Sequence, residues 1–220
     1  MSLQALEELK GFRHWVGWKI EPGKDGKPTK VPYVANNGRK AKTNNPATWT
    51  RFASAAPAYK GAGHNGLGFV VALDDPFCGI DLDHCRNPET GAIDEWAKEI
   101  IERFNSYTEI TPSETGLRIW IKARKLGSSC EKAMGEGGRK LEIYDHLRFF
   151  TVTGAHLDGT PETIEDRQGK YDQFYDELWP EKPSGTASRT SPTTSLTAYE
   201  ILDLARQAKN AAKWDSLMRG

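Results

Sequence analysis

The stretch FCGIDLDHC, residues 77–85, is an apolar run that ends in two aspartates, Asp81 and Asp83. On a β-strand the side chains of residues i and i+2 point to the same face, so both carboxylates are expected to project from one spot on a sheet. Carboxylates this close repel each other, and the pair is more stable when positive charge lies beside it. A solvated strand end, or a cap for a following helix, would explain the same pair without such a cation.

The segments around this stretch predict an α+β domain. The strands at 66–72 and 77–83 are expected to form a hairpin, and those at 139–145 and 147–154 a second strand pair. The short connections favour an antiparallel or mixed sheet with helices packed on one face. Further strands are expected at 14–20, 30–35, 106–113 and 116–123, and helices at 46–59, 91–105 and 163–178.

The composition predicts three regions along the chain, a domain at 1–180, a flexible linker at 181–196 and a small helical segment at 197–220. The linker sequence is rich in Pro, Ser, Thr and Gly and has almost no apolar residues. The last segment cannot bury much core alone, so we expect it to be the start of a further helical region beyond Gly220.

Overall composition is that of a globular protein, with 37% hydrophobic and 27% charged residues in a chain of 220. No apolar run reaches the roughly 20 residues that span a bilayer, and no signal peptide is recognisable. The three cysteines form no CxxC pair, which favours the reducing cytoplasm.

The net charge is zero, which by itself argues against a strongly basic nucleic-acid binder. Basic residues nevertheless dominate 1–64 and 116–148, on either side of an acidic stretch. Such blocks can fold into a basic groove beside an acidic pocket, or they can be solvated faces of mixed sign.

Other segments carry residues that could join the aspartate pair. The strand KLEIYD offers Glu142, whose neighbours Leu141 and Ile143 point the other way. Three carboxylates within reach of one another suit hard cations such as Mg²⁺ or Mn²⁺. Donors for phosphate oxygens are available from Arg148 and from the segment TPSETGLR, through Ser113, Thr115, Gly116 and Arg118.

The motifs GIDLDHC, EITPSETGLRIWIKA and KLEIYDHLRFFTVTG, in this order and spacing, resemble the archaeo-eukaryotic primase superfamily. The likeness is specifically to the primase-polymerase domains of phage and plasmid replication proteins, and it covers about residues 6–178. The early WVGWK, KVPY and NNGRKA segments with Lys30 also look like the family pattern. The resemblance implies a primase-polymerase fold, with an RRM-like mixed or antiparallel catalytic sheet flanked by helices.

The resemblance also implies an enzyme, a metal-dependent DNA primase or polymerase that transfers nucleotides from NTP or dNTP to a 3′-OH. The expected partners are a single-stranded DNA template, a primer and a helicase domain, in a bacterial or phage-infected cell. One departure is Arg118, which stands where many members have a histidine and which could bind phosphate but not shuttle protons. The implied metal ligands are Asp81, Asp83 and Glu142; the nucleotide contacts are Ser113, Thr115, Gly116, Arg118, Tyr144 and Arg148; the template contacts are Lys27, Lys30, Arg39, Lys40 and Lys42.

Two other functions are compatible with parts of this pattern. A non-catalytic module that binds single-stranded nucleic acid would keep the fold and the basic segments without turnover. A replication-initiator nuclease would need a His-x-His pair, which the sequence lacks. His84 and Cys85 follow the aspartates, but their spacing fits no zinc motif.

Overall fold

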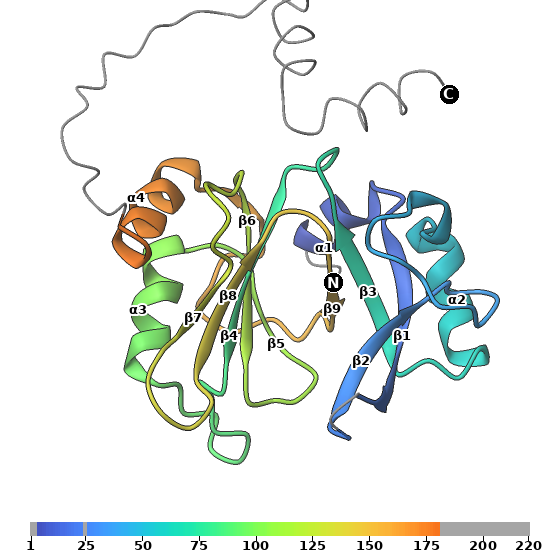
Figure 1. Cartoon of the computed structure of the whole chain (residues 1–220), viewed down its shortest axis with the longest axis horizontal. Coiled ribbons are helices and arrows are strands. Elements are labelled where there is room, and N and C mark those ends of the chain that lie inside the picture. Colours follow the sequence, from blue (N-terminus) through green and yellow to red (C-terminus); the bar gives the residue numbers. More distant parts are fainter. Residues whose placement is uncertain (1–3, 24–25, 181–220) are drawn as a thin grey trace, which may run out of the picture. The chain divides into compact units, whose positions relative to one another are not determined.

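The structure of the protein is a computed structural model that describes residues 4–23 and 26–180. Within this part the chain forms two separate β-sheets and four α-helices, which confirms the α+β class. In Figure 1 the two sheets stand side by side, with α3 and α4 outside one of them and α2 outside the other. The helices are α1 (Gln4–Lys10), α2 (Phe52–Gly61), α3 (Glu95–Phe104) and α4 (Gln168–Leu178).

The first sheet has four antiparallel strands in the order β2-β1-β3-β9. The strands expected at 14–20 and 30–35 are confirmed as β1 and β2, which pair as a hairpin with a register from Gly17–Tyr33 to Pro22–Pro28. The strands are β1 (Trp15–Pro22), β2 (Pro28–Tyr33), β3 (Gly66–Val71) and β9 (Arg148–Val152).

The second sheet has six strands, with β4 at its centre between β6 and β8. All its pairs are antiparallel except β10 with β6. The strands are β4 (Phe77–Asp83), β5 (Thr108–Ile110), β6 (Leu117–Lys122), β7 (Glu131–Ala133), β8 (Lys140–Tyr144) and β10 (Glu165–Asp166).

Two expected strand pairings are wrong, because the chain crosses from one sheet to the other at both places. β3 and β4 do not form a hairpin: β3 pairs with β1 and β9, whereas β4 pairs with β6 and β8. Likewise, β8 and β9 belong to different sheets. The carboxylate of Asp75 fixes the first crossing by accepting backbone hydrogen bonds from Ala72 and Phe77, each at 2.8 Å.

The three helices expected within the described residues all begin later than their sequence patterns suggested, and the one expected at 91–105 spans Glu95–Phe104. The segment 46–59 begins with a short 3₁₀ turn, Pro46–Thr48, capped by Asn45, and α2 starts only at Phe52. Between them Thr50 exchanges backbone hydrogen bonds with Trp15, which holds this stretch extended. The helix expected from residue 163 begins at Gln168, because Glu165–Asp166 pairs with β6 as β10.

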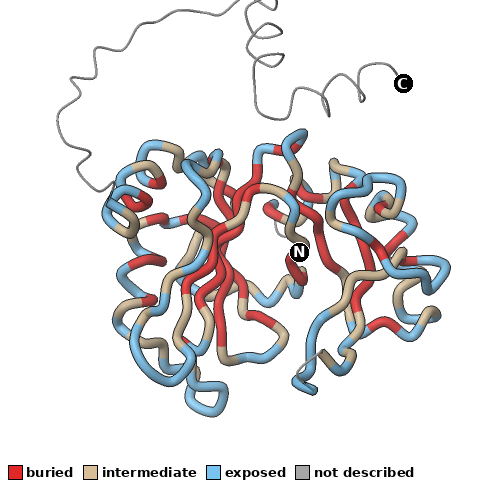
Figure 2. The backbone as a smooth tube through the Cα atoms, viewed as in Figure 1, coloured by how far each residue is buried: buried red, intermediate tan, exposed pale blue. Residues whose placement is uncertain are grey.

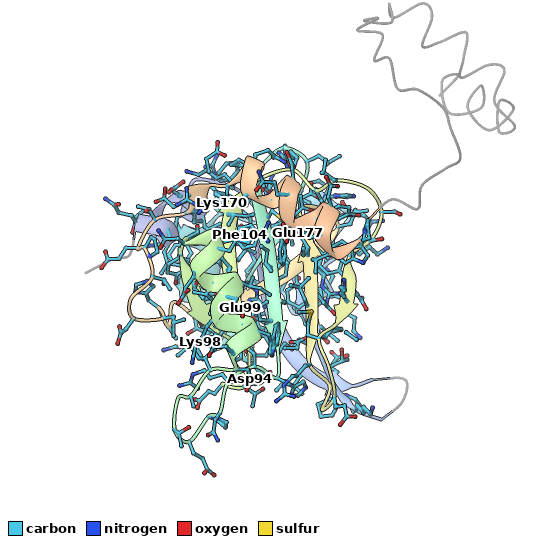
Figure 3. The ribbon with its side chains drawn as sticks, turned by 90° about the vertical axis from the view of Figure 1, so that its left-hand side faces the viewer. Asp94, Lys98, Glu99, Phe104, Lys170 and Glu177 are labelled. Atoms are coloured by element: carbon cyan, nitrogen blue, oxygen red, sulfur yellow. The ribbon has the colours of Figure 1, made fainter. Side chains whose placement is uncertain are left out.

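One face of the six-stranded sheet is apolar and is covered by α3 and α4. Ile80 and Leu82 of β4 and Ile119 of β6 lie in this core together with Phe104 of α3 and Tyr171 of α4. Figure 3 shows the two helices lying across the sheet. Because alternate residues of a strand face opposite sides, Asp81 and Asp83 must point away from this core.

The opposite face of the six-stranded sheet meets the four-stranded sheet through aromatic side chains. Phe69 and Phe150 pack edge to face against the ring of Trp120, with centroid distances of 6.0 and 5.5 Å. The approach requires glycine at position 79, because a methyl group there would lie 2.5 Å from the Phe150 ring. Figure 2 shows that buried residues concentrate in the strands at the middle of the two sheets, such as β3, β4 and β6.

The predicted linker at 181–196 and helical segment at 197–220 lie outside the described residues. Among the described helices, none combines the length and the apolar character needed to cross a membrane.

Candidate functional site

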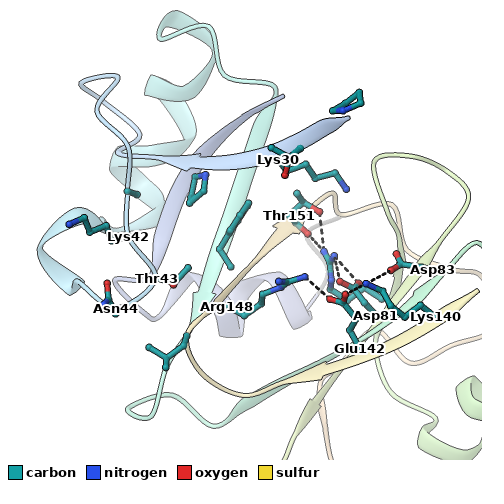
Figure 4. A pocket seen from close by; sticks show the side chains of 17 residues that line it. Lys30, Lys42, Thr43, Asn44, Asp81, Asp83, Lys140, Glu142, Arg148 and Thr151 are labelled. Atoms are coloured by element: carbon teal, nitrogen blue, oxygen red, sulfur yellow. Dashed lines mark hydrogen bonds and ion pairs between the residues drawn. The ribbon is translucent and has the colours of Figure 1, made fainter. Parts of the chain in front are cut away.

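A cleft of about 970 Å³ opens between the two sheets beside their aromatic contact. Its first wall is the six-stranded sheet, which contributes the predicted carboxylates. Its second wall comes from β2, from the loop 41–44 and from β9 (Figure 4). The charged residues that line it are Lys30, Lys42, Asp81, Asp83, Arg118, Lys140, Glu142 and Arg148.

Three of these charged side chains form a row across adjacent strands. The antiparallel register places Asp81 of β4 directly opposite Arg118 of β6 on one side and Glu142 of β8 on the other. Directly opposed residues of an antiparallel pair share a face, so all three point toward the cleft. All are at least nine-tenths buried, with exposed fractions of 9% for Asp81, 4% for Arg118 and 3% for Glu142.

Two cations neutralise Glu142 from the cleft side. Arg148 Nη2 donates to Glu142 Oε2 at 2.5 Å, and Lys140 Nζ donates to Glu142 Oε1. Lys140 Nζ also lies 4.0 Å from Asp83 Oδ2. The predicted partner Arg148 therefore reaches the site, but its contact in this structure is a carboxylate.

Asp83 stands at the more open end of the row, with 43% of its side chain exposed. Its partial burial, followed by the negative charges of Asp81 and Glu142, raises the pKa of Asp83 above its ordinary value. The negative charges around Asp83 therefore outweigh the positive charge of Lys140, and this excess favours binding of a further cation there.

The donor set of Asp81, Asp83 and Glu142 fits a hard divalent cation, because all of its atoms are carboxylate oxygens. In this structure, however, the oxygens of the three carboxylates do not all lie within 4.8 Å of one another. Among the described residues, the group of acidic and histidine side chains that lies this close together is His14, Asp74 and Asp75. A metal ion shared by all three carboxylates would therefore require at least one of these side chains to rotate.

Arg118 contacts protein groups and not the phosphate that its sequence context suggested. Nη2 donates to Asp81 Oδ2 at 3.1 Å, and Nη1 donates to the carbonyl and, at 3.1 Å, to the hydroxyl of Thr151 on β9. The guanidinium also lies over the Phe150 ring, 4.7 Å from its centroid. All of these contacts are with protein groups, and the expected contact of Arg118 with phosphate stays a prediction.

The second wall places Lys30 opposite the carboxylates, as Figure 4 shows. Loss of contact with water lowers the pKa of Lys30, and the positive charge of Arg118 lowers it further. Its side chain projects from β2, an element of the other sheet. A bound anion would therefore meet cations from both walls of the cleft.

The expected nucleotide-binding turn lies beside the site but outside the cleft lining. The hydroxyls of Ser113 and Thr115 are 3.1 Å apart, and the Thr115 carbonyl accepts from the backbone of Cys85. Gly116 packs against the end of β4, where a methyl group would lie 2.9 Å from the carbonyl of Leu82. The turn thus buttresses the strand that carries Asp83.

Tyr144 also lies outside the lining, although it shares a face with Glu142. Its hydroxyl donates to Glu131 at 3.1 Å, and Arg148 lies over its ring with the guanidinium carbon 4.6 Å from the centroid. The contacts of Tyr144 position Arg148, and its expected contact with a sugar stays a prediction.

Of the five basic residues expected to contact a template, the cleft is lined by Lys30 and Lys42. The backbone of Lys42 is held by Thr48, and its carbonyl accepts from the Trp49 indole at 2.8 Å. Lys40 pairs with Glu21 at 2.8 Å. Lys27 and Arg39 lie outside the lining.

Sequence reasoning missed Lys140, Thr151 and Glu109. Lys140 carried a usable signal, since it precedes Glu142 by two residues on the same strand and so shares its face. Thr151 carried none, because its contact with Arg118 depends on β9 joining the other sheet. Glu109 lies opposite Arg118 on the neighbouring strand β5, so the same strand parity could have indicated it.

A second cluster of acidic residues surrounds His14 at the crossing from β3 to β4. Its Nδ1 lies 3.1 Å from Asp75 and its Nε2 lies 3.4 Å from Asp74. Asp75 is already satisfied by two backbone N–H groups, and the two ring nitrogens face different carboxylates. This arrangement suits an ion pair of protonated His14 better than a shared metal ion.

The His14 pair makes stability depend on pH. Burial tends to lower the pKa of His14, but the hydrogen bond and charge of Asp75, with help from Asp74, outweigh burial and raise it above 6.5. A raised histidine pKa stabilises the fold fully below the unfolded value, and this contribution is lost as pH rises through the folded value. We therefore expect the free energy of unfolding to fall as pH rises from about 6.5, the ordinary histidine pKa, into the alkaline range.

Urea unfolding of the wild type and of His14→Gln across that pH range measures this effect. The variant should be less stable at the acid end and should show a smaller change with pH. Equal pH slopes for the two proteins would show that His14 is not the group responsible.

Comparison with known proteins identifies a phage relative of the chain. No protein-family model matches the chain. A protein named DNA Primase-polymerase, from Nitratiruptor phage NrS-1, is 36% identical over 165 residues, which is 75% of this chain. The match covers 22% of the phage protein, so the chain spans only about a fifth of the length of this relative. The cleft and its carboxylates therefore lie in a chain that contains a primase-polymerase domain, homologous to part of that phage protein.

Proposed function

We propose that the chain is a template-directed nucleotidyltransferase, a DNA primase or polymerase that acts in the replication of a phage or mobile element. The observation that carries this proposal is the grouping of Asp81, Asp83 and Glu142 in the wall of a cleft about 970 Å³ in volume. That volume lies at the upper end of the roughly 300–1,000 Å³ of small-molecule sites. The homology to a primase-polymerase supports the same assignment.

In the proposed reaction a primer 3′-OH, or the hydroxyl of an initiating nucleotide, attacks the α-phosphate of an NTP or dNTP and pyrophosphate leaves. Asp81, Asp83 and Glu142 would hold Mg²⁺ or Mn²⁺. Two such ions, when bound, would stabilise the attacking and leaving oxygens.

The residues of the chain itself would contribute by binding and positioning. Arg148 of β9 and Lys30 of β2 both line the second wall, where they can bind phosphates that lie against the carboxylates of the first wall. Lys140 and Arg148 both form ion pairs with Glu142 in the absence of substrate. When the triphosphate binds, each of the two cations would either move from Glu142 to a phosphate oxygen or stay and offset the negative charge of Glu142. Catalysis would rest on orientation and on charge stabilisation in a partly enclosed cleft.

The partners implied by this function are a single-stranded DNA template, a primer and a nucleoside triphosphate. Lys42, beside Thr43 and Asn44 on the second wall, is placed to meet a template phosphate. A helicase domain or partner remains a prediction from the sequence.

Primer extension and de novo priming by the full chain test the proposal. We expect synthesis on a DNA template with Mg²⁺ or Mn²⁺, its loss on addition of EDTA, and its recovery with excess metal, because the carboxylates repel the triphosphate unless metal ions lie between them. A module that only binds nucleic acid would take up single-stranded DNA in EDTA and make no product with either metal. That second outcome would overturn the assignment as an enzyme.

A further inference from the structure

Glu109 of β5 is a charged side chain in the interior that the proposed reaction does not use. It is 0% exposed and lies opposite Arg118 in the register of β5 and β6. The row of charges across the sheet is therefore four residues long, in the order Glu109, Arg118, Asp81 and Glu142. Three of the four are acidic, and Arg118 stands between two of them.

The contacts of Glu109 are those of an ionised carboxylate. Oε2 accepts from the backbone N–H groups of Thr153 at 3.1 Å and of Gly154 at 2.9 Å. Weaker contacts come from the Tyr107 hydroxyl to Oε2 and the Trp120 indole to Oε1, each at 3.4 Å. The two backbone N–H groups and the indole can only donate, and the hydroxyls of Tyr107 and Thr153 can donate as well, so the surroundings favour the ionised carboxylate.

Arg118 connects this buried carboxylate to the cleft. Its Nη1 lies 3.8 Å from Glu109 Oε1, and its Nη2 lies 2.8 Å from Asp81 Oδ1. Burial raises the pKa of Glu109, and the charge of Arg118 is the largest influence that opposes this rise. One guanidinium thus serves two carboxylates, one inside the protein and one in the wall of the cleft.

We propose that Glu109 is a positioning residue of the metal site, which acts through Arg118 to orient Asp81 and to keep its negative charge available to a cation. This inference rests on the proposed function, because it takes Asp81 as a metal ligand. With Glu109 ionised, Arg118 and the two carboxylates carry a net charge of −1. Without that charge, Arg118 and Asp81 form a neutral pair, which attracts a divalent cation less strongly.

The substitution Glu109→Gln tests the charge while it keeps the shape of the side chain. We expect Mn²⁺ to bind about 10- to 100-fold more weakly, the usual scale for loss of a group that orients a metal ligand. Electron paramagnetic resonance of free Mn²⁺, titrated with protein in the absence of DNA and nucleotide, measures this affinity directly. The same loss should appear as a higher Mn²⁺ requirement for primer extension.

A structural role alone would give a different result, since Glu109 also anchors Thr153 and Gly154. Asp75→Asn is the matched control, because Asp75 is equally buried and accepts two backbone N–H groups but lines no part of the cleft. It should lower stability and leave Mn²⁺ affinity unchanged. A Glu109→Gln protein that also binds Mn²⁺ as the wild type does would overturn the proposal.

Two further measurements separate this inference from the proposed function. Mn²⁺ binding by the wild type, and its loss in Asp83→Asn, tests the site itself, and a wild type that binds no Mn²⁺ would overturn both. Should Glu109→Gln fail to fold, Arg118→Lys tests the same link, because one ammonium cannot contact Asp81, Thr151 and Glu109 together. We expect weaker Mn²⁺ binding in that variant, and unchanged binding would contradict the proposal.

Discussion

Asp83→Asn should abolish metal-dependent DNA synthesis while leaving the protein folded. Asp83 stands at the open end of the charged row, and the substitution removes one anionic ligand from the proposed metal site. Metal ions supply several kcal/mol of transition-state stabilisation in phosphoryl transfer, so the rate should fall by about 10³-fold or more. Primer extension under single-turnover conditions, with Mg²⁺ and separately with Mn²⁺, measures the loss.

Stability should not explain that loss. The nearest cation to Asp83 is 4.0 Å away, and burial together with its acidic neighbours raises the pKa of Asp83, so a neutral amide should be tolerated there. Asp158→Asn is the matched control, since Asp158 is exposed on a loop and lies outside the cleft lining. If both variants retain wild-type synthesis while remaining folded, Asp83 is not a ligand of the catalytic metal.

Arg118→Met should be the most destabilising single change at the site. It would leave Asp81 and Glu109 facing each other with no cation between them, and it would remove the donor to the Thr151 carbonyl. Breaking a buried ion pair from one side costs about 3–5 kcal/mol, because the remaining charge is left uncompensated. Urea unfolding at neutral pH measures the change in the free energy of unfolding.

Two comparisons identify uncompensated charge as the cause. Arg103 makes an equally short contact with Glu177, 2.6 Å, but on the surface, so Arg103→Met should have a far smaller effect. Adding Glu109→Gln to Arg118→Met removes one of the orphaned anions and should restore part of the stability. A double variant less stable than Arg118→Met alone would mean that lost packing, and not charge, dominates.

The charged row could be predicted because strand parity is a local property. Asp81, Asp83 and Glu142 alternate with Ile80, Leu82, Leu141 and Ile143, and that alternation determined which face each would occupy. The presence of both arginines near the carboxylates was also predictable from the strands that carry them. Their contacts were not, since Arg118 turned to protein oxygens and Arg148 to Glu142.

The pairing of the strands could not be predicted from the same patterns. Phe69, Val70 and Val71 of β3 are consecutive and all 0% exposed, so this strand shows neither a preferred face nor which sheet it joins. The alternation in β4 shows which face lies in the core, but not which strands flank it. Apolar runs buried on both faces carry no register signal, and adjacency in sequence favoured a hairpin. The separation into two sheets, and with it the cleft, depends on contacts such as Gly79 with Phe150 that lie far apart in the sequence.

The charged row also has a consequence for how the sequence can drift. An acid at position 109 is tolerable in a sealed interior because a base stands at 118, and that base is useful because an acid stands at 81. Substitutions at these three positions are therefore expected to occur together and not independently. A lineage that lost Arg118 would gain by losing Glu109 as well, so the arginine at position 118 is tied to a partner nine residues earlier.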